Sequence, residues 1–216
     1  MKLPILIRDA ESGKPCQAEL NTLVIEDLAA IDKEWKPYLD GKIELAEQRG
    51  IRWWQLPQHQ GWDWASKIDA NADPDAYIIF GIKYDAHYQG LMIVNNNYYA
   101  ALDAEGEVAA EEDLEKELTI HIDFLSVAPW NLVEFLTKID EAPRFRSVGR
   151  ALMQVAVQLS FENGYKGRVG LYALPQAEGF YEKCGMIPID RDCDHECLCY
   201  YELTLSGAEA LRGGAV

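Results

Sequence analysis

The chain has 216 residues, of which 49% are hydrophobic and 26% are charged, the composition of an ordinary water-soluble globular protein. Its formal net charge is −16, from 36 acidic and 20 basic residues, which argues against binding to duplex nucleic acid or attachment to a membrane through basic residues. No stretch approaches the roughly 20 apolar residues that span a bilayer, and the start lacks the apolar length of a signal sequence. We therefore expect one cytoplasmic domain over residues 1–216, with no nucleic-acid or membrane partner.

The first 75 residues predict strands followed by helices. Two apolar runs within residues 5–25 flank the turn-like sequence ESGKP, which predicts a hairpin or a pair of edge strands. The sequence DLAAIDKEW has apolar side chains at helical spacing, and IELAEQRG continues the helix after Pro37, which we expect to interrupt it. The following sequence, RWWQLPQHQGWDW, forms either a layer of the core or one wall of a pocket. It contains Trp53, Trp54, Trp62 and Trp64.

The middle of the chain predicts three strands. Residues 76–84 and 90–100 are β-rich runs joined by a short polar link, as in an antiparallel pair. The acidic residues 102–117 predict a solvated loop or a short helix. The sequence LTIHIDFLSV, 118–127, alternates with a period of two and predicts a strand with two distinct faces. One face would carry Ile120, Ile122 and Phe124, and the other would carry His121, Asp123, Leu125 and Val127.

The last third of the chain predicts helices that alternate with strands. A long connection, 129–143, leads to FRSVGRALMQVAVQLS, whose apolar residues recur at helical spacing. RVGLYAL predicts a strand, QAEGFYEKCG a short helix, CLCYYELTL a closing strand, and 206–216 a flexible tail. The strand–helix–strand unit makes its two strands parallel, whereas the other strands form antiparallel meanders. We expect a mixed α/β (α+β) domain, with N-terminal elements in 1–75 and the core sheet in 76–205.

Three arginines surround the start of the predicted helix, namely Arg144, Arg146 and Arg150. A helix N-terminus exposes unpaired backbone N–H groups and the positive end of the helix dipole, which together suit a pyrophosphate. Gly149 would let the chain approach the phosphates without a Cβ in the way. The arginines either add charge-assisted contacts to this ligand or pair with the acidic residues of 134–141.

The five cysteines lie at positions 16, 184, 193, 197 and 199. An odd number without a signal sequence favours free thiols. The sequence CDHECLC has the residue types of a metal site but lacks the paired spacing of a zinc knuckle. Residues 197–203 also have the pattern of a strand, and we expect buried thiols and no metal.

Three segments resemble motifs of the GNAT superfamily of N-acetyltransferases. RSVGRA, 146–151, resembles its pyrophosphate-binding turn, R-x-x-G-x-A, and AEGFYEKCGM, 177–186, resembles its A-x-x-F-Y-x-K-x-G-F segment. FLSVAP, 124–129, resembles the strand that precedes the turn. The resemblance covers about 124–186. It implies the GNAT fold, with a mostly antiparallel sheet and one parallel strand pair.

The resemblance also implies acetyl-CoA as the cofactor. In GNAT proteins the pantetheine arm pairs with the strand that corresponds to 124–128, much as an added β-strand would, and two neighbouring strands separate at a bulge. No bulge can be recognised in the sequence itself. The cofactor-binding residues that follow from this resemblance are Leu125, Ser126, Val127, Arg144, Arg146, Ser147, Val148, Gly149, Arg150 and Ala151.

Acyl transfer to an amine requires a base, an oxyanion donor and an acid for the departing thiolate. Tyr181 matches the family's tyrosine, whose hydroxyl can donate to sulfur; otherwise it packs between helix and sheet. His121 and Asp123 are the candidate bases, because a carboxylate often acts from the position of His121 in the family and a histidine titrates near neutrality. The alternative for His121 is a hydrogen-bonded, half-buried side chain. The backbone N–H near Leu125 or Val127 would be the oxyanion donor.

The acceptor is expected to be a small-molecule or protein amine. GNAT acceptor pockets are commonly built from N-terminal helices and adjacent loops, and aromatic walls suit a cationic or aromatic amine. The substrate-binding residues expected on this basis are Trp53, Trp54, Tyr84 and Tyr98. Loop 129–143 is longer than the common link, so it either shapes this pocket or forms a contact between two copies in a homodimer.

The chain departs from the family pattern at two further positions. Leu174 stands where many members have an asparagine that contacts the cofactor, and Met186 replaces an aromatic residue. The main expectation is an enzyme, an acetyl-CoA-dependent N-acyltransferase. The alternatives are a non-catalytic module that binds acyl-CoA or another protein, and a mononucleotide-binding protein that uses the same turn.

Overall fold

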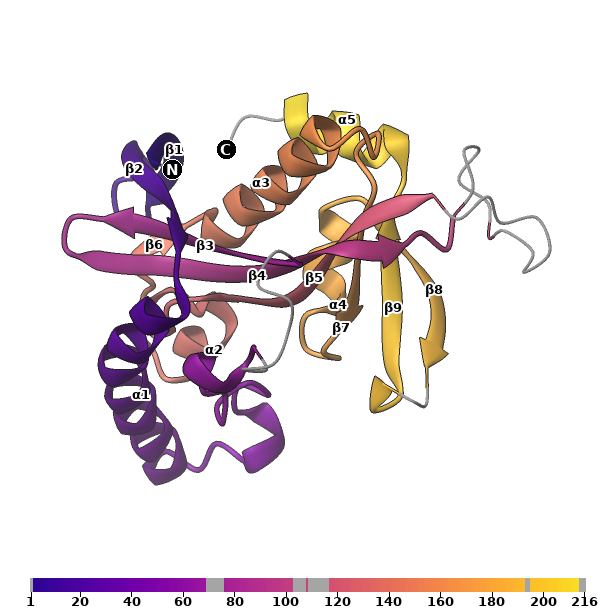
Figure 1. Cartoon of the computed structure of the whole chain (residues 1–216). Coiled ribbons are helices and arrows are strands. Elements are labelled where there is room, and N and C mark those ends of the chain that lie inside the picture. The colour runs from indigo at the N-terminus through magenta and orange to yellow at the C-terminus, as the bar shows by residue number, and fades with distance from the viewer. Residues whose placement is uncertain (1, 69–75, 103–107, 109–116, 193–194, 214–216) are drawn as a thin grey trace.

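The computed structural model describes residues 2–68, 76–102, 108, 117–192 and 195–213 of the chain (Figure 1). Within these residues nine strands form one sheet, in the order β6-β1-β2-β3-β4-β5-β7-β9-β8. All neighbouring strands are antiparallel except β5 and β7. The predicted mixed α/β fold with one parallel strand pair is confirmed. The strands are β1 (Lys2–Asp9), β2 (Pro15–Leu23), β3 (Tyr77–Tyr84), β4 (His87–Tyr99), β5 (Leu118–Val127), β6 (Phe145–Arg146), β7 (Val169–Ala173), β8 (Met186–Asp192) and β9 (Leu198–Leu203).

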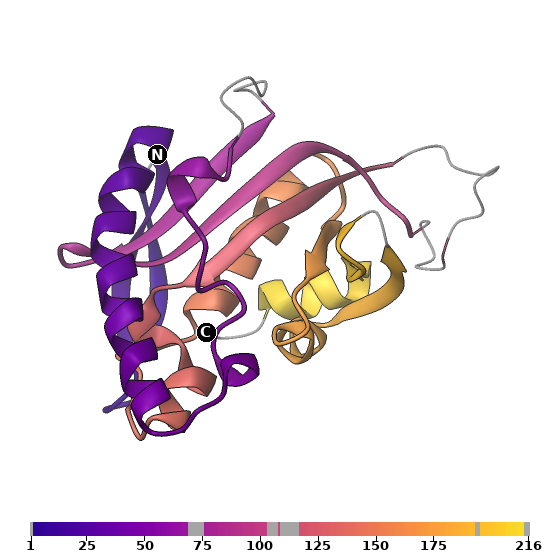
Figure 2. The same ribbon diagram turned by 90° about the horizontal axis from the view of Figure 1, so that it is seen from below.

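Helices cover both faces of the sheet. Figures 1 and 2 show α1 and α2 on one face and α3 and α5 on the other. On β4, Leu91 and Ile93 pack in the cluster that contains α1 residues, whereas Met92 and Val94 pack in the cluster that contains α3 residues. The period-two alternation of the strand thus fills two separate cores. The helices are α1 (Ile25–Gln48), α2 (Val133–Lys138), α3 (Val148–Glu162), α4 (Glu178–Lys183) and α5 (Leu205–Gly213).

Helix α1 runs through Pro37 without a break, so the predicted interruption is wrong. Pro37 lies on the exposed side of the helix, where water can satisfy the carbonyl that loses its backbone partner. The buried stripe of Leu28, Ile31, Trp35 and Leu39 continues past the proline and holds the helix against its neighbours.

Strand β5 contains a bulge at Asp123, and this bulge corrects the predicted faces of the strand. Phe124 pairs with Ile93 and Ile122 pairs with Val94, so Asp123 has no partner across the β4–β5 ladder. An extra residue reverses the alternation beyond it. Leu125 therefore packs on the α3 side with Ile122 instead of sharing the face of His121. Likewise Val127 packs on the α3 side, and Phe124 packs on the α1 side.

The C-terminal part differs from the prediction in two places. Residues 205–213 form α5, with Ala208 and Leu211 buried in the core, instead of lying in a flexible tail. Strand β8 was not predicted; it pairs with β9 at the edge of the sheet. The predicted acidic loop at 102–117 lies mostly outside the described residues. None of the described helices has the combination of length and apolar character that a membrane crossing requires.

Candidate functional site

A cavity of about 1060 Å³ opens where β5 and β7 separate. The two strands pair over only three positions, from Ile120 opposite Val169 to Ile122 opposite Leu171. Beyond this point β5 and β7 no longer pair with each other, so their facing edges diverge. The cavity is lined at one end by Arg146 and Ser147 and at the other by Tyr172 and His195.

The N-terminus of α3 lines one end of the cavity. Ser147 adopts a left-handed backbone with φ of 65° and begins the helix, and no side chain among the described residues caps it. The lining includes Ser147, Val148, Gly149 and Arg150. The first N–H groups of a helix have no intrahelical partner and carry the positive end of its dipole. This end of the cavity can therefore hold a phosphate or another anion.

Of the three arginines predicted at this turn, the structure brings two to the cavity. Arg146 and Arg150 line it. Arg144 is outside the lining, and its guanidinium lies over the rings of Trp130 and Tyr38, 5.0 and 5.8 Å from their centroids. Ala151 is also outside the lining and is fully buried in the core.

Gly149 allows close packing between α3 and α4. A Cβ at this position would lie 3.1 Å from Cζ of Phe180, closer than side chains normally approach one another. The glycine thus lets the aromatic ring rest against the first turn of α3. Phe180 also lines the cavity, so its position affects the shape of the cavity.

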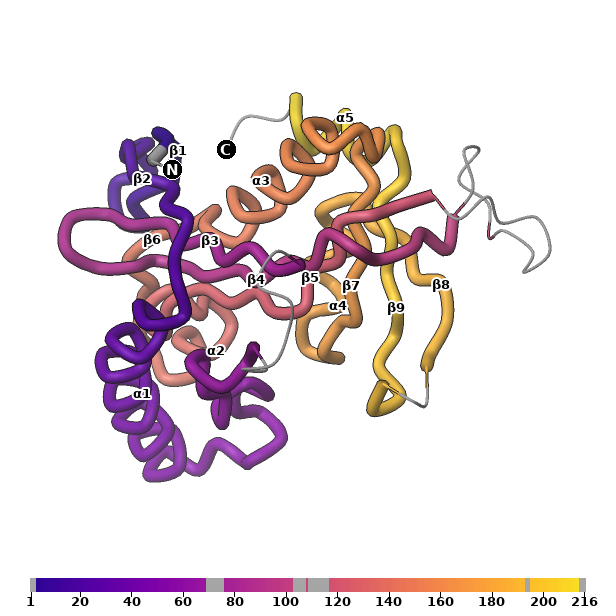
Figure 3. The backbone as a smooth tube through the Cα atoms, in the orientation of Figure 1, coloured from indigo at the N-terminus to yellow at the C-terminus, as the bar shows by residue number. Residues whose placement is uncertain are grey.

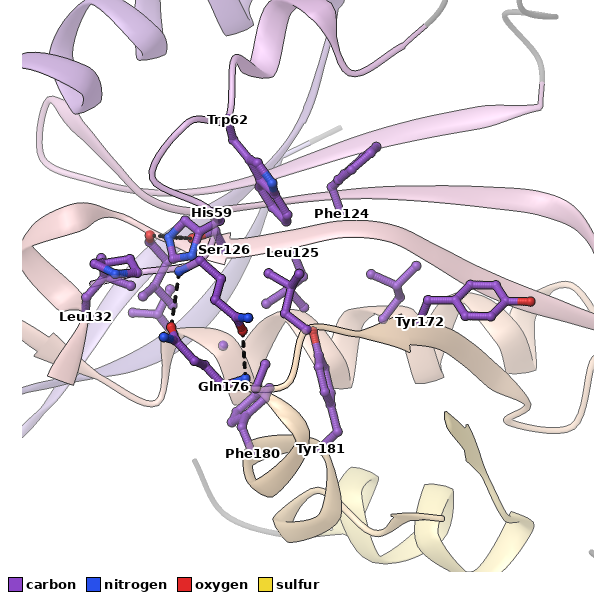
Figure 4. Close-up of a pocket in the computed structure, with 18 of the residues that line it drawn as sticks. His59, Trp62, Phe124, Leu125, Ser126, Leu132, Tyr172, Gln176, Phe180 and Tyr181 are labelled. Atoms are coloured by element: carbon purple, nitrogen blue, oxygen red, sulfur yellow. Dashed lines mark hydrogen bonds between the residues drawn. The ribbon is translucent and has the colours of Figure 1, made fainter. Parts of the chain in front are cut away.

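Tyr181 extends from α4 toward Leu125 on β5 and lines the middle of the cavity (Figure 4). The side chain is buried, and its hydroxyl makes no hydrogen bond with the described part of the chain. Burial raises the pKa of Tyr181 well above its ordinary value, because the phenolate would lose its hydration. The hydroxyl therefore keeps its proton at neutral pH and can donate it within the cavity.

His121 and Asp123 form a hydrogen-bonded pair on the cavity wall. His121 Nδ1 and Asp123 Oδ1 are 2.7 Å apart, and the imidazole stacks on Tyr98 with ring centroids separated by 4.1 Å. His121 Nε2 is buried and has no hydrogen-bond partner among the described residues. The side chain of Asp123 is 21% exposed, against 7% for His121. The carboxylate is therefore the more accessible member of the pair.

Sequence reasoning missed His59, which contacts the cofactor strand predicted from the motifs. Its Nε2 lies 3.1 Å from Ser126 Oγ, and the Ser126 hydroxyl donates to the carbonyl of Val127 at 3.0 Å. Burial lowers the pKa of His59 to about 4, so the imidazole is neutral near pH 7. Nothing in the sequence around His59 indicates this long-range contact.

The segment 54–59, which we call the strap, lies beside this contact and lines the cavity with Gln55, Pro57, Gln58 and His59. Gln58 N–H donates to Gln176 Oε1 at 3.1 Å, and Gln176 N–H donates to Gln58 Oε1 at 2.8 Å. Gln176 Nε2 also donates to the carbonyls of Trp54 and Leu56. The strap therefore connects β5, through His59, to the segment between β7 and α4. Figure 3 shows residues 49–68, the described chain that follows α1, on the α2 side of the sheet.

The predicted acceptor residues are only partly brought together. Trp53 and Trp54 are 78% and 53% exposed and lie outside the cavity lining, as does Tyr84, whose ring packs on Phe145. Tyr98 lines the cavity, and so does Trp62, whose ring contacts Phe124. Leu174, at the position of the expected asparagine, is a lining residue as well.

The cysteine-rich segment does not assemble a ligand set within the described residues. Cys199 is buried and Cys197 is exposed in a turn with positive φ, so the two do not share a strand face as expected; Cys193 lies outside the described residues. No group of three or more histidine, cysteine, aspartate or glutamate side chains in the described part of the chain could hold a metal ion.

The arrangement matches the fold of known acetyltransferases. No protein-family model matches the sequence, and a search of curated proteins also gives no match. The solved structure of AAC(6')-Ib with paromomycin and acetyl-CoA is 15% identical over 91% of this chain and 98% of that chain, with a TM-score of 0.53. The structure of the same protein with ribostamycin and coenzyme A is 16% identical over 91% and 98%, with a TM-score of 0.52. Its complex with coenzyme A and kanamycin is 16% identical over 90% and 98%, with a TM-score of 0.51. The predicted GNAT fold is confirmed.

Proposed function

We propose that this chain of GNAT fold is an acyl-CoA-dependent N-acyltransferase that moves an acetyl group from acetyl-CoA to a primary amine. The observation that carries the proposal is that the uncapped start of α3 and the hydroxyl of Tyr181 line one cavity, at the point where β5 and β7 separate. A structural neighbour of the same fold was solved with acetyl-CoA bound. The proposal extends that ligand to this chain.

The cavity fits a diphosphate ester with an extended thiol arm. The N–H groups at the start of α3, with Arg146 and Arg150, would hold the diphosphate. Ala128 N–H donates to Gln89 on β4, and strand amides alternate in direction, so the N–H groups of Leu125 and Val127 face the opening toward β7. They would pair with the arm and donate to the oxygen of the acyl group.

Acetyl-CoA, when bound, supplies an activated acetyl thioester. Asp123, with His121 hydrogen-bonded behind it, accepts the proton that the acceptor ammonium must lose before it attacks. The Tyr181 hydroxyl donates its proton toward the departing sulfur, and its burial beside Leu125 keeps that proton in place until it is needed. The strap covers the reaction from bulk water near Ser126.

The experiment is a direct assay of acetyl transfer. The purified protein is incubated with acetyl-CoA and a panel of aliphatic, aromatic, aminoglycoside and peptide amines, and free thiol is followed together with binding of coenzyme A by calorimetry. Tyr181→Phe should lower kcat about 100-fold and leave the Kd of coenzyme A unchanged, because it removes only a proton donor. Tyr201→Phe, a buried tyrosine outside the cavity lining, is the matched control.

Two outcomes would reject the proposal. Binding of coenzyme A without turnover on any amine would favour a non-catalytic acyl-CoA-binding module. Binding of simple nucleotides as tightly as coenzyme A would favour a mononucleotide-binding protein.

A further inference from the structure

The end of the cavity farthest from α3, which we call the distal end, is built from tyrosine, histidine and carboxylate side chains. It comprises Tyr98, His121, Asp123, Tyr172, His195 and Glu196. Tyr98 stacks on His121, and Tyr172 stacks on His195 with ring centroids 4.2 Å apart and planes 9° apart. These residues come from β4, β5, β7 and the β8–β9 connection, and Tyr98 is the member of this group that was also predicted to bind the acceptor.

The hydroxyl groups at the distal end are arranged to accept hydrogen bonds. Tyr172 donates its hydroxyl proton to Asp192 Oδ2 at 3.1 Å, and His195 Nδ1 lies 2.7 Å from the same oxygen. The proton of Tyr172 is thus already used, and its oxygen can only accept from a molecule in the cavity. The hydroxyl of Tyr98 lies 3.4 Å from that of Tyr172. A ligand with several N–H donors fits such a surface.

The charges at the distal end also favour a cation. Asp123 and Glu196 line the cavity and Asp192 stands directly behind Tyr172, whereas Lys67 is the positive side chain that the lining contributes here. The ammonium of Lys67 lies over the rings of Phe124 and Trp62, 4.4 and 4.6 Å from their centroids. Two carboxylates that line the cavity and a third behind Tyr172 thus outnumber the one ammonium, and the aromatic faces add cation–π attraction.

A second observation points to a ligand at the same place. His121 is 5% exposed and lines the cavity, yet its Nε2 has no hydrogen-bond partner among the described residues. A buried ring nitrogen without a partner costs free energy, and a polar group of a bound molecule would remove this cost.

We propose that the distal end binds the second positive charge of a diamine or polyamine acceptor. This inference rests on the proposed function, because the first amine of the same molecule is the one acylated. The ammonium of that amine first gives one proton to the Asp123–His121 pair, which releases it to solvent. The neutral nitrogen then forms the amide bond while the carbon–sulfur bond breaks, the thiolate takes the proton of Tyr181, and the second proton lost by the nitrogen restores the Tyr181 hydroxyl. The second ammonium stays charged beside Tyr172 and Glu196, with Asp192 behind Tyr172, throughout.

The test compares two acceptors of equal chain length, cadaverine and pentylamine, which differ only in the second ammonium. We expect kcat/KM to be at least about tenfold higher for cadaverine, the gain that about 1.4 kcal/mol of extra binding produces. The double variant Asp192→Asn with Glu196→Gln should bring this ratio close to one, mainly through a higher KM for cadaverine. Asp190→Asn removes an exposed carboxylate from the same strand outside the lining and should keep the ratio of the wild type.

Calorimetry with coenzyme A-saturated protein measures the binding of the two amines without requiring turnover. Equal binding and equal kcat/KM for both amines, or an unchanged ratio in the double variant, would overturn the inference. If neither amine is acylated but cadaverine binds more tightly than pentylamine and the double variant loses this preference, the binding site stands and the proposed enzymatic function fails. If pentylamine is acylated as well as cadaverine, the function stands and the diamine site fails.

Discussion

Gln58 and Gln176 hydrogen-bond each other in both directions, backbone amide to side-chain oxygen, although 118 residues separate them. With two further bonds from Gln176 to backbone carbonyls, this pair joins the strap to the segment that precedes α4. Both the strap and Tyr181 line the cavity. The exposed residue Gln176 thus connects the strap, on one side of the cavity, to the segment before α4 on the other.

Replacing Gln176 by alanine should loosen the strap. The variant loses the three hydrogen bonds made by the Gln176 side chain, each worth about 1 kcal/mol in net stability. Amide hydrogen exchange of 54–59, measured by mass spectrometry, should accelerate at least about tenfold while exchange in β4 stays unchanged. Gln158→Ala, an exposed glutamine on α3, is the control. Unchanged protection of 54–59 would mean that the strap is held by other contacts.

The arginines at the start of α3 should differ in their effect on cofactor affinity. Arg146 and Arg150 line the cavity, so Arg146→Ala and Arg150→Ala should each weaken binding of coenzyme A about tenfold and reduce its salt dependence. Arg144→Ala should leave this affinity unchanged and lower the free energy of unfolding by about 1 kcal/mol, through loss of its contact with Trp130. Titration calorimetry at two salt concentrations measures both. Equal losses of affinity at Arg144 and Arg146 would contradict this assignment.

His59 should make the folded protein sensitive to acid. Its pKa falls from 6.5 to about 4 on burial, so the unfolded chain binds a proton between these values and the folded protein does not. Stability is fully present above pH 6.5 and declines as pH falls toward 4, by about 3 kcal/mol in total. His59→Gln should remove this part of the loss, as measured by urea unfolding at pH 7 and pH 4.5. His87→Gln keeps His59 and should keep the loss that His59 causes.

A methyl group at Gly149 should affect the cavity more than the fold. In Gly149→Ala the new Cβ would displace the ring of Phe180, which also lines the cavity. Overpacking lowers the free energy of unfolding by about 1–3 kcal/mol, and the better helix propensity of alanine raises it by about 1 kcal/mol. We expect the free energy of unfolding to change by about 1 kcal/mol and the Kd of coenzyme A to rise about tenfold. Gly179→Ala, on α4 where a Cβ meets nothing within 4 Å, gains the helix propensity without overpacking, so it should raise the free energy of unfolding by about 1 kcal/mol and leave the Kd of coenzyme A unchanged.

The parts predicted best from sequence are those set by local patterns. Strand β5 and helix α3 follow from period-two and helical spacing, and the turn at Ser147 follows from the motif that precedes the helix. Pro37 was misjudged because the cost of an exposed proline is smaller than the gain from burying one continuous apolar stripe. Helix α5 was misjudged because its two buried residues depend on α3 and the end of β9 for their burial.

The parts of the site that could not be predicted depend on contacts between distant segments. The sequence TIHIDF alternates regularly, and only the two consecutive apolar residues Phe124 and Leu125 break the pattern, a local sign too weak to establish that Asp123 is left unpaired against β4. The tryptophan-rich segment has the composition of a buried wall. Trp53 and Trp54 nevertheless lie outside the cavity lining, because the strap presents Gln58 and His59 to the cavity instead. The position of the distal end depends on where β9 and β8 enter the sheet.

The unpaired Asp123 is a single inserted residue, and its neighbours do not depend on it for their places in the sheet. Ile122 and Phe124 already pair with the adjacent residues Val94 and Ile93, so deleting Asp123 would restore a regular ladder and keep Phe124 to Val127 on their present faces. Ser126 would still face His59. The deletion would instead remove the carboxylate beside His121 and the local bend that a bulge gives to β5. Homologous chains with a gap at this position should therefore keep the sheet and lose this part of the site.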